Sequence, residues 1–371
     1  LVKTQPGNGN YNLWYGVCCL ETGEPAEALK HLESAVKRRV PSGQLYLARA
    51  YNDLYRFEEA IETYETYISD LRKRKRSTEE AEQLLEKSKS NLRMLKGVEE
   101  VCFIDSFVVD KEKFLDAYKI SPESGKLFMY DTYFNDSGKE GGTVYETELG
   151  NKLYYSEMQP DSTLSILSRN KLLDKWSDGS LLPGSINEAM NADYPYVLTD
   201  GITIYYASDG PGSMGGYDIF VTRYNTNTDS YLMPENVGMP FNSPYNDYMM
   251  VFDEVKGLGW FVSDRFQPEG KACVYLFIPN PEHKRVESED IEVKRARAAI
   301  TAIRDSWKES SDYADLIRLS HTEIPYGEKK IEKDFEFIIG NNIVYYKLDD
   351  INSPEAKGYY EKVVALNKQI K

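Results

Sequence analysis

Hydrophobic residues in the first hundred positions recur with the period of an α-helix, and the pattern is repeated. Segments 12–38 and 45–71 align so that matched residues lie 32 positions apart. Small residues at matched positions let the two helices of a hairpin approach closely, and larger ones fill the space between hairpins. The matched pairs are Gly16 with Ala48, Ala28 with Ala60, Leu32 with Tyr64, and Ala35 with Tyr67. We therefore expect paired helices over residues 11–70.

A third amphipathic segment starts with a Ser-x-x-Glu capping box at Ser77 and Glu80 and stops at Gly97. It predicts a capping helix that completes a helical domain over residues 1–97. The basic run 72–76 precedes it. This run is either a contact for an acidic lipid or protein or a solvated helix end. We favour the helix end, because cations complement the C-terminal helix dipole.

After residue 97 the period of the hydrophobic pattern changes to two, which is typical of strands. Similar strand-and-turn segments occur at 150–158, 200–209, 257–265 and 340–350, and Asn187 and Asp193 align with Asn242 and Asp247. A repeat of about 50 residues with about four short strands indicates a β-propeller blade. The predicted fold class is α+β multidomain: helical hairpins, then a propeller of four to five blades, five preferred, over residues 98–350.

The two ends of the propeller region are each incomplete as blades. We expect residues 335–350 to pair with residues 100–115 in one shared blade, because an open sheet edge invites aggregation. A helical insertion is predicted over 289–320, where an apolar stripe runs along one face, and the start of a C-terminal helix over 351–371. The stripe consists of Ile291, Ala296, Ile300, Ile303 and Trp307.

A glycine-dense turn separates two strand-like runs between residues 205 and 225. We expect Gly215 and Gly216 to permit the turn, and Asp209 and Asp218 to accept hydrogen bonds from its N–H groups. A calcium loop would need more oxygen ligands than the two carboxylates that flank this turn. The turn is therefore interpreted as a hinge between strands, with no metal.

Composition narrows the class of partner. The chain of 371 residues carries 45 Lys and Arg against 60 Asp and Glu, a net charge of −15, which argues against nucleic acid and against an anionic partner. The 29 tyrosines fit strands. The four cysteines, Cys18, Cys19, Cys102 and Cys273, have no zinc spacing and are expected to be buried thiols. No apolar run spans a bilayer, and attachment through a segment before Leu1 is left open.

Catalytic motifs are absent from the sequence. His31, His283 and His321 are scattered and none lies beside a nucleophile motif. We expect no enzyme activity and no cofactor. The alternative is a glycan-binding or glycan-cleaving propeller, which would use acids near the axis. The candidate acids are Glu146, Glu148, Asp253 and Glu254.

The helical repeat resembles the tetratricopeptide repeat over residues 11–70. The resemblance implies a concave peptide-binding face, although the helices could instead brace the next domain. The positions that match the family's ligand-facing ones are Leu13, Val17, Leu20, Arg49, Asn52 and Asp53.

The segment 194–225 resembles the TolB-like propeller repeat, in which Ser-Asp-x-x-Gly is followed by Gly-Gly-Tyr-Asp-Ile. The matching residues are Ser208, Asp209, Gly212, Gly215, Gly216, Tyr217, Asp218 and Ile219. Proteins that combine the two repeats look like cell-envelope components of Bacteroidetes-type bacteria, often with an OmpA-like domain, which is not found in this sequence. The resemblance implies a non-catalytic scaffold or protein-interaction module, periplasmic or outer-membrane-associated. A nutrient-uptake accessory lipoprotein is a third possibility.

Overall fold

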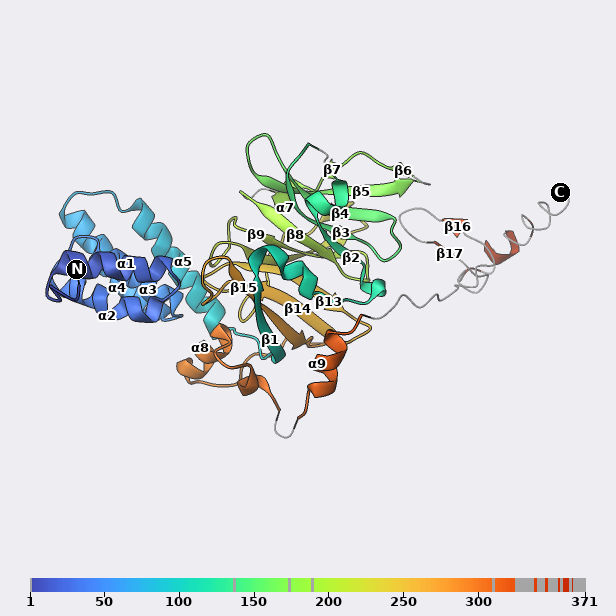
Figure 1. Cartoon of the computed structure of the whole chain (residues 1–371). Coiled ribbons are helices and arrows are strands. Elements are labelled where there is room, and N and C mark those ends of the chain that lie inside the picture. The colour runs from blue at the N-terminus through green and yellow to red at the C-terminus, as the bar shows by residue number, and fades with distance from the viewer. Residues whose placement is uncertain are drawn as a thin grey trace. The chain divides into compact units, whose positions relative to one another are not determined.

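The computed structural model describes residues 2–135, 138–172, 175–187, 190–308 and 311–323, with 337–338, 344–345, 353, 356–359 and 362. The chain divides into two compact units, residues 1–324 and 325–371. In the first unit, helices are followed by antiparallel sheets (Figure 1), so the predicted α+β class is confirmed. Most of the predicted C-terminal helix over 351–371 lies outside the described residues, and residues 356–359 are helical.

Five helices form the N-terminal part and pack in chain order. Gly16 shows why small residues recur there: a Cβ at this position would lie 2.6 Å from Cγ of Leu32. Ala28, Ala48 and Ala60 are fully buried at the aligned positions. The helices are α1 (Gly9–Glu21), α2 (Pro25–Lys37), α3 (Gly43–Asp53), α4 (Phe57–Lys73) and α5 (Glu79–Lys96).

The predicted capping box of the fifth helix is wrong. Thr78 rather than Ser77 is the N-cap of α5, and it makes no side-chain cap hydrogen bond. Its hydroxyl instead donates to Oε1 of Glu82 at 2.9 Å, and Glu82 also pairs with Arg72 at 2.7 Å. The helix end at Gly97 is as predicted.

Three antiparallel sheets follow the helices in the first unit. The first contains β2 (Lys126–Met129), β3 (Gly141–Glu146), β4 (Lys152–Met158), β5 (Leu164–Leu172), β6 (Lys175–Trp176) and β7 (Ser180–Leu181). The second contains β8 (Ala192–Val197), β9 (Thr203–Ser208), β10 (Asp218–Asn225), β11 (Ser230–Tyr231) and β12 (Glu235–Asn236). The third contains β13 (Asp247–Asp253), β14 (Leu258–Ser263), β15 (Lys271–Ile278) and β1 (Cys102–Asp110). Three sheets of four or more strands occur among the described residues, where the sequence predicts four to five blades.

The strand that the structure shows beside residues 100–115 is β15, and most of the predicted partner segment, 335–350, lies outside the described residues. β1 pairs with β15 along its length, from Cys102 opposite Ile278 to Asp110 opposite Lys271. Within 335–350 the described strands, β16 (Phe337–Ile338) and β17 (Val344–Tyr345), pair with each other. β15 is buried along most of its length, so the backbone groups on both of its edges need partners. β14 supplies one edge and β1 the other.

Successive sheets are joined by repeated contacts. β8 packs against β3, β4 and β5, and β13 packs against β8, β9 and β10. Asn187 donates to O of Ile166 at 2.9 Å and accepts from its N at 2.8 Å. Asn242 makes the same pair of bonds with Ile219, both at 2.8 Å. The alignment of these two asparagines is therefore confirmed as a repeated clamp on a strand of the preceding sheet, β5 for Asn187 and β10 for Asn242.

Short helices complete the first unit: η1 (Lys111–Ala117), η2 (Pro122–Ser124), α6 (Tyr130–Phe134), α7 (Gly184–Asn187), α8 (Ile291–Ala299), η3 (Ile303–Ser306) and α9 (Ala314–Ser320). The predicted insertion over 289–320 is thus broken into pieces. α8 ends at Ala299, and its C-cap Ile300 has a left-handed φ of 53°. Nε1 of Trp307 then donates to O of Phe103 at 2.7 Å, so this segment covers part of the edge of β1 that does not face β15.

Candidate functional site

The hydrophobic part of the predicted partner-binding set lies in the core. Leu13 and Leu20 are 3% and 5% exposed and belong to a cluster that includes Leu47 and Ala50 of α3. Val17 packs against the same cluster. Leu13 and Leu20 are covered by neighbouring helices and are not surface positions, whereas Val17 is half-buried at the edge of the cluster. Burial of Leu13 and Leu20 stabilises the helical part.

The polar part of the set lies beside a cavity of about 430 Å³, called here the α3–α5 groove. Arg49 and Asn52 line it from α3. Its other lining residues come from α3, α4, α5, the β9–β10 loop and the segment before β13. They are Leu45, Tyr46, Tyr64, Glu80, Leu84, Lys87, Ser88, Met214, Gly215 and Pro244. The groove therefore lies between the helical part and the second and third sheets.

Polar contacts hold the helical wall of the groove in place. Nη1 of Arg49 lies 2.7 Å from Oε1 of Glu21, and its Nε lies 3.9 Å from Oδ2 of Asp53. Burial raises the pKa of Asp53 to about 7, and the charge of Arg49 opposes this rise. Oδ1 of Asn52 accepts from Oγ of Ser88 at 3.2 Å and thereby links α3 to α5.

The two glycines of the β9–β10 loop are needed for close approach rather than for their dihedral angles. A Cβ on Gly215 would lie 1.9 Å from O of Tyr245, and one on Gly216 would lie 2.1 Å from Oδ1 of Asn246. Neither has a positive φ, whereas Gly212 has a φ of 93°. The predicted hinge is therefore a contact between this loop and the segment that leads into β13.

Asp218 fixes the loop as the sequence predicted. Its carboxylate accepts from N of Met214 at 2.8 Å and from N of Gly215 at 3.1 Å. Burial, with a further contribution from Asp247, raises the pKa of Asp218 to about 7. Nζ of Lys87 donates to O of Gly215 at 2.7 Å, which ties α5 to the same loop. Burial lowers the pKa of this lysine.

Asp209 acts across the sheet rather than in its own turn, so that prediction is wrong. It accepts from N and Nδ2 of Asn191 at 2.7 and 2.8 Å. Asp264 makes the equivalent bonds to Asn246 in the third sheet, both at 2.9 Å. The other motif residues are also structural: Ser208 accepts from N of Gly210, and the ring of Tyr217 packs on Tyr194 and Tyr248.

A shared hydrophobic cluster joins the two walls of the groove. It contains Tyr55, Phe57 and Leu95 of the helical part together with Met214 and Met239 of the sheet part. The hydroxyl of Tyr245 also donates to O of Asp53 at 3.3 Å. Both walls are thus fixed by burial of apolar side chains, and the groove is formed before any ligand binds.

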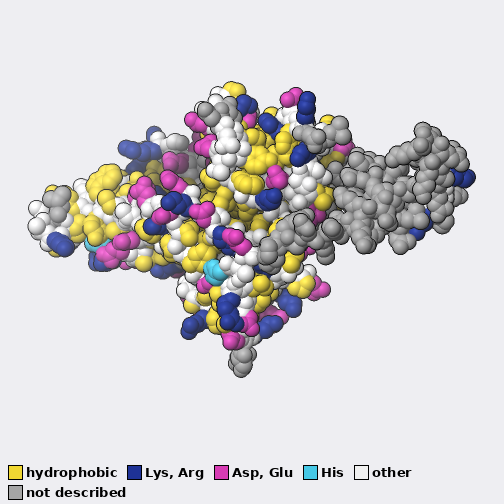
Figure 2. All heavy atoms as spheres, turned by 45° about the vertical axis from the view of Figure 1, so that its right-hand side comes forward, with side chains coloured by type: hydrophobic (Ala, Val, Ile, Leu, Met, Phe, Trp, Pro, Cys, Tyr) yellow, Lys and Arg dark blue, Asp and Glu magenta, His cyan; other side chains and the backbone are white. Residues whose placement is uncertain are grey.

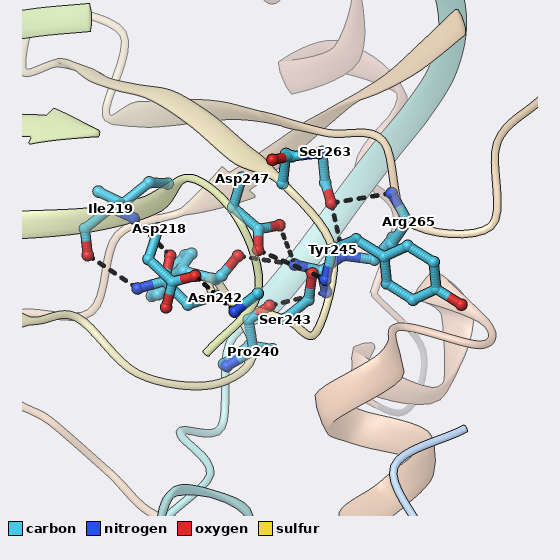
Figure 3. Close-up of polar contacts among 12 residues, drawn as sticks. Asp218, Ile219, Pro240, Asn242, Ser243, Tyr245, Asp247, Ser263 and Arg265 are labelled. Carbon is cyan, nitrogen blue, oxygen red and sulfur yellow. Dashed lines mark hydrogen bonds and ion pairs between the residues drawn. The ribbon is translucent and has the colours of Figure 1, made fainter. Parts of the chain in front are cut away.

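Arg265, which follows β14, forms a buried polar cluster that sequence reasoning missed (Figure 3). The side chains of Arg265 and Asp247 are 0% exposed, and Nη2 lies 2.7 Å from Oδ1. The guanidinium also donates to O of Pro240 at 2.9 Å, O of Phe241 at 2.6 Å and O of Ala298 at 3.2 Å. The available signal was that Arg265 follows Ser-Asp where the preceding repeat has Gly210.

The acids of the glycan hypothesis are mostly engaged in structure. Glu146 accepts from the hydroxyl of Tyr133 at 2.8 Å. Asp253 accepts from N and Oγ of Ser121 at 2.6 and 2.7 Å. Glu148 differs, because its pKa is raised by burial and then by the charges of Glu123 and Glu254.

The histidines and cysteines do not converge. His31 lies 2.8 Å from Asn12, His283 2.9 Å from Glu99, and His321 3.5 Å from Asp105. All four cysteines are free thiols, of which Cys19 and Cys273 are buried and Cys18 is exposed. Within the described part of the chain, no group of three or more His, Cys, Asp or Glu side chains is placed to hold a metal ion.

The surface in Figure 2 carries acidic and basic side chains interspersed with hydrophobic ones. No helix among the described residues is both long and apolar enough to cross a membrane. Comparison of the chain with protein-family models, curated proteins and solved structures found no match.

Proposed function

We propose that this chain is a non-catalytic protein-interaction module and that the α3–α5 groove binds a segment of a protein partner. The observation that carries the proposal is the cavity of about 430 Å³ lined by Arg49 and Asn52 of the predicted set. Its volume lies within the range of about 300–1,000 Å³ that is usual for ligand sites. Its two walls come from distant parts of the chain, and a common hydrophobic cluster joins them.

The groove chemistry suits a peptide. Leu45 and Leu84 offer apolar contacts, Tyr46 and Tyr64 offer aromatic rings, and Arg49 brings a cation to the same cavity. A peptide segment presents apolar side chains and polar main-chain groups together, so it can contact both the apolar and the polar residues that line the groove. Aromatic and arginine side chains are also the residues that most often dominate binding at protein interfaces.

The wider proposal is that the helices are tetratricopeptide-like hairpins and that the sheets are propeller-like blades of an envelope scaffold. The alignment of segments 12–38 and 45–71 supports the first part. The asparagine clamps at Asn187 and Asn242 support the second, because they repeat between successive sheets. The periplasmic or outer-membrane location rests on the family resemblance. Fractionation of cells that express the native gene, with detection in the envelope rather than the cytosol, tests it.

The groove is tested with peptides selected from a random phage-displayed library on the full chain. Fluorescence anisotropy then compares the wild type with Arg49→Ala and Leu84→Ala. We expect each variant to weaken binding about 10-fold, as for the loss of one anchoring side chain. Arg223→Ala and Leu232→Ala are matched controls, because both positions are exposed on the second sheet and should leave the affinity unchanged.

Two results would contradict the groove as the binding site. One is a set of selected peptides whose affinity is the same for the groove variants and the wild type. The other is an equal loss of affinity for the groove and control variants, which would indicate nonspecific binding. Melting temperatures of all four variants verify that each is folded.

A second candidate function, a glycan-binding or glycan-cleaving module, is favoured by the raised pKa of Glu148 next to Glu123 and Glu254. A general acid in a glycosidase needs a raised pKa and a second carboxylate nearby. Reducing-end assays with peptidoglycan fragments test it. Release of reducing ends that is lost in Glu148→Gln would establish this function in place of the scaffold.

A further inference from the structure

A second cavity, of about 340 Å³, lies where α2 and α4 end and α3 begins, and it is called here the arginine pocket. Three arginines line it, and they come from two separate helix ends. Arg39 follows α2, whereas Arg74 and Arg76 follow α4. The remaining lining residues are Val36, Val40, Pro41, Ser42, Gln44, Tyr67, Asp70 and Leu71.

The three guanidinium groups have no partner within the described part of the chain. Neither a hydrogen bond nor an ion pair joins the side chain of Arg39, Arg74 or Arg76 to another described residue. Their neighbours in the basic run are paired: Arg72 lies 2.7 Å from Glu82, and Lys73 lies 3.3 Å from Asp70. A chain with 60 acidic residues thus leaves three arginines unpaired around one cavity.

We propose that the arginine pocket binds a small, multiply charged oxyanion of the phosphate class. A guanidinium presents its N–H donors in a planar fork that matches phosphate oxygens, and several such groups together favour more than one negative charge. Ser42 adds a hydroxyl, since it is the N-cap of α3 without a side-chain cap hydrogen bond. Tyr67 adds a second hydroxyl. Burial raises the pKa of this hydroxyl, and the nearby charges of Arg76 and Arg74 oppose the rise.

The net charge of −15 does not prevent this binding. Exposed charges are screened over about 10 Å at 0.1 M salt, so the arginines that line the cavity dominate the field inside it. The one lining acid, Asp70, is engaged by Lys73. Small anions are therefore accepted locally, although an extended polyanion would still meet the acidic remainder of the surface.

Calorimetry with inorganic pyrophosphate as the probe tests the proposal on the full chain. We expect saturable binding by the wild type, with affinity reduced about 10-fold in Arg39→Gln and again in Arg74→Gln, as for the loss of a charge-assisted hydrogen bond. Arg72→Gln is the matched control from the same basic run, because Arg72 pairs with Glu82 and does not line the pocket. It should bind as the wild type does.

The decisive comparison is between Arg39→Gln and Arg72→Gln. Binding in the pocket requires Arg39, which lies outside the basic run 72–76, whereas binding by the basic run as a whole would require Arg72. Equal losses in Arg39→Gln and Arg72→Gln would overturn the proposal, and so would the absence of saturable binding by the wild type. Vesicles rich in phosphatidylserine form a separate arm. Vesicle binding without pyrophosphate binding would also overturn it, since it would indicate a membrane-facing surface.

Discussion

Replacement of Arg265 by methionine gives the sharpest test of how the sheets are held together. The guanidinium is fully buried and bonds to Asp247, to the hydroxyl of Ser263 and to three backbone carbonyls. Methionine preserves most of the aliphatic stem but removes every donor. The carboxylate of Asp247 is then left buried with its charge uncompensated.

The expected loss of stability is about 4 kcal/mol, because removal of one member of a buried ion pair costs about 3–5 kcal/mol. Urea unfolding followed by tryptophan fluorescence measures it, since Trp260 is 1% exposed in the same sheet. Arg223→Met is the matched control: Arg223 is 61% exposed and lies 3.8 Å from Asp200. This exposed pair should contribute at most about 0.5 kcal/mol.

A double variant separates the charge from the packing. Asp247→Asn in the Arg265→Met background removes the stranded charge, so we expect recovery of about 1–2 kcal/mol through the coupling of the two sites. The reasoning is refuted if Arg265→Met unfolds within about 1 kcal/mol of the wild type. The reasoning is also refuted if Asp247→Asn destabilises the Arg265→Met variant as much as it destabilises the wild type, because the two sites would then be independent.

Three further predictions concern the sheet contacts. Asn242→Ala should lower the unfolding free energy by about 2 kcal/mol, because it leaves the buried N–H of Ile219 without its acceptor and removes a second donor to O of Ile219, which keeps N of Val237; urea unfolding at wild-type stability would contradict it. Gly215→Ala should cost about 2 kcal/mol through its contact with backbone, whereas Gly184→Ala, with no atom within 4 Å of the added Cβ, should change the melting temperature little. Asp218 has a pKa of about 7 in the folded state and about 3.9 in the unfolded state. Between these pH values the folded state holds a proton on Asp218 that the unfolded state has released. The contribution of Asp218 to stability therefore falls as pH rises from about 4 to about 7. The stability of the wild type relative to Asp218→Asn should therefore decrease over that range, and a constant difference would exclude the assigned pKa.

The sequence alone determined where helices and strands lie and which positions repeat. Side-chain periodicity depends on local backbone geometry, so the pattern around Gly16 and Ala48 was sufficient to locate the paired helices. The clamp at Asn187 and Asn242 was also visible as a repeat, because the same polar residue recurs at the same place in successive units. Such features need only the order of residues along the chain.

The tertiary structure decided which segments meet. The sequence suggested residues 335–350 as the partner of residues 100–115, and it gave no sign that β15 pairs with β1, a pairing that supplies one of the two edges that buried β15 needs. Leu13 and Leu20 looked like surface positions until the neighbouring helices covered them. Arg265 and Asp247 lie 18 residues apart, and the groove unites Arg49 with Gly215. Contacts of this kind arise when distant apolar surfaces are buried together, which no local pattern encodes.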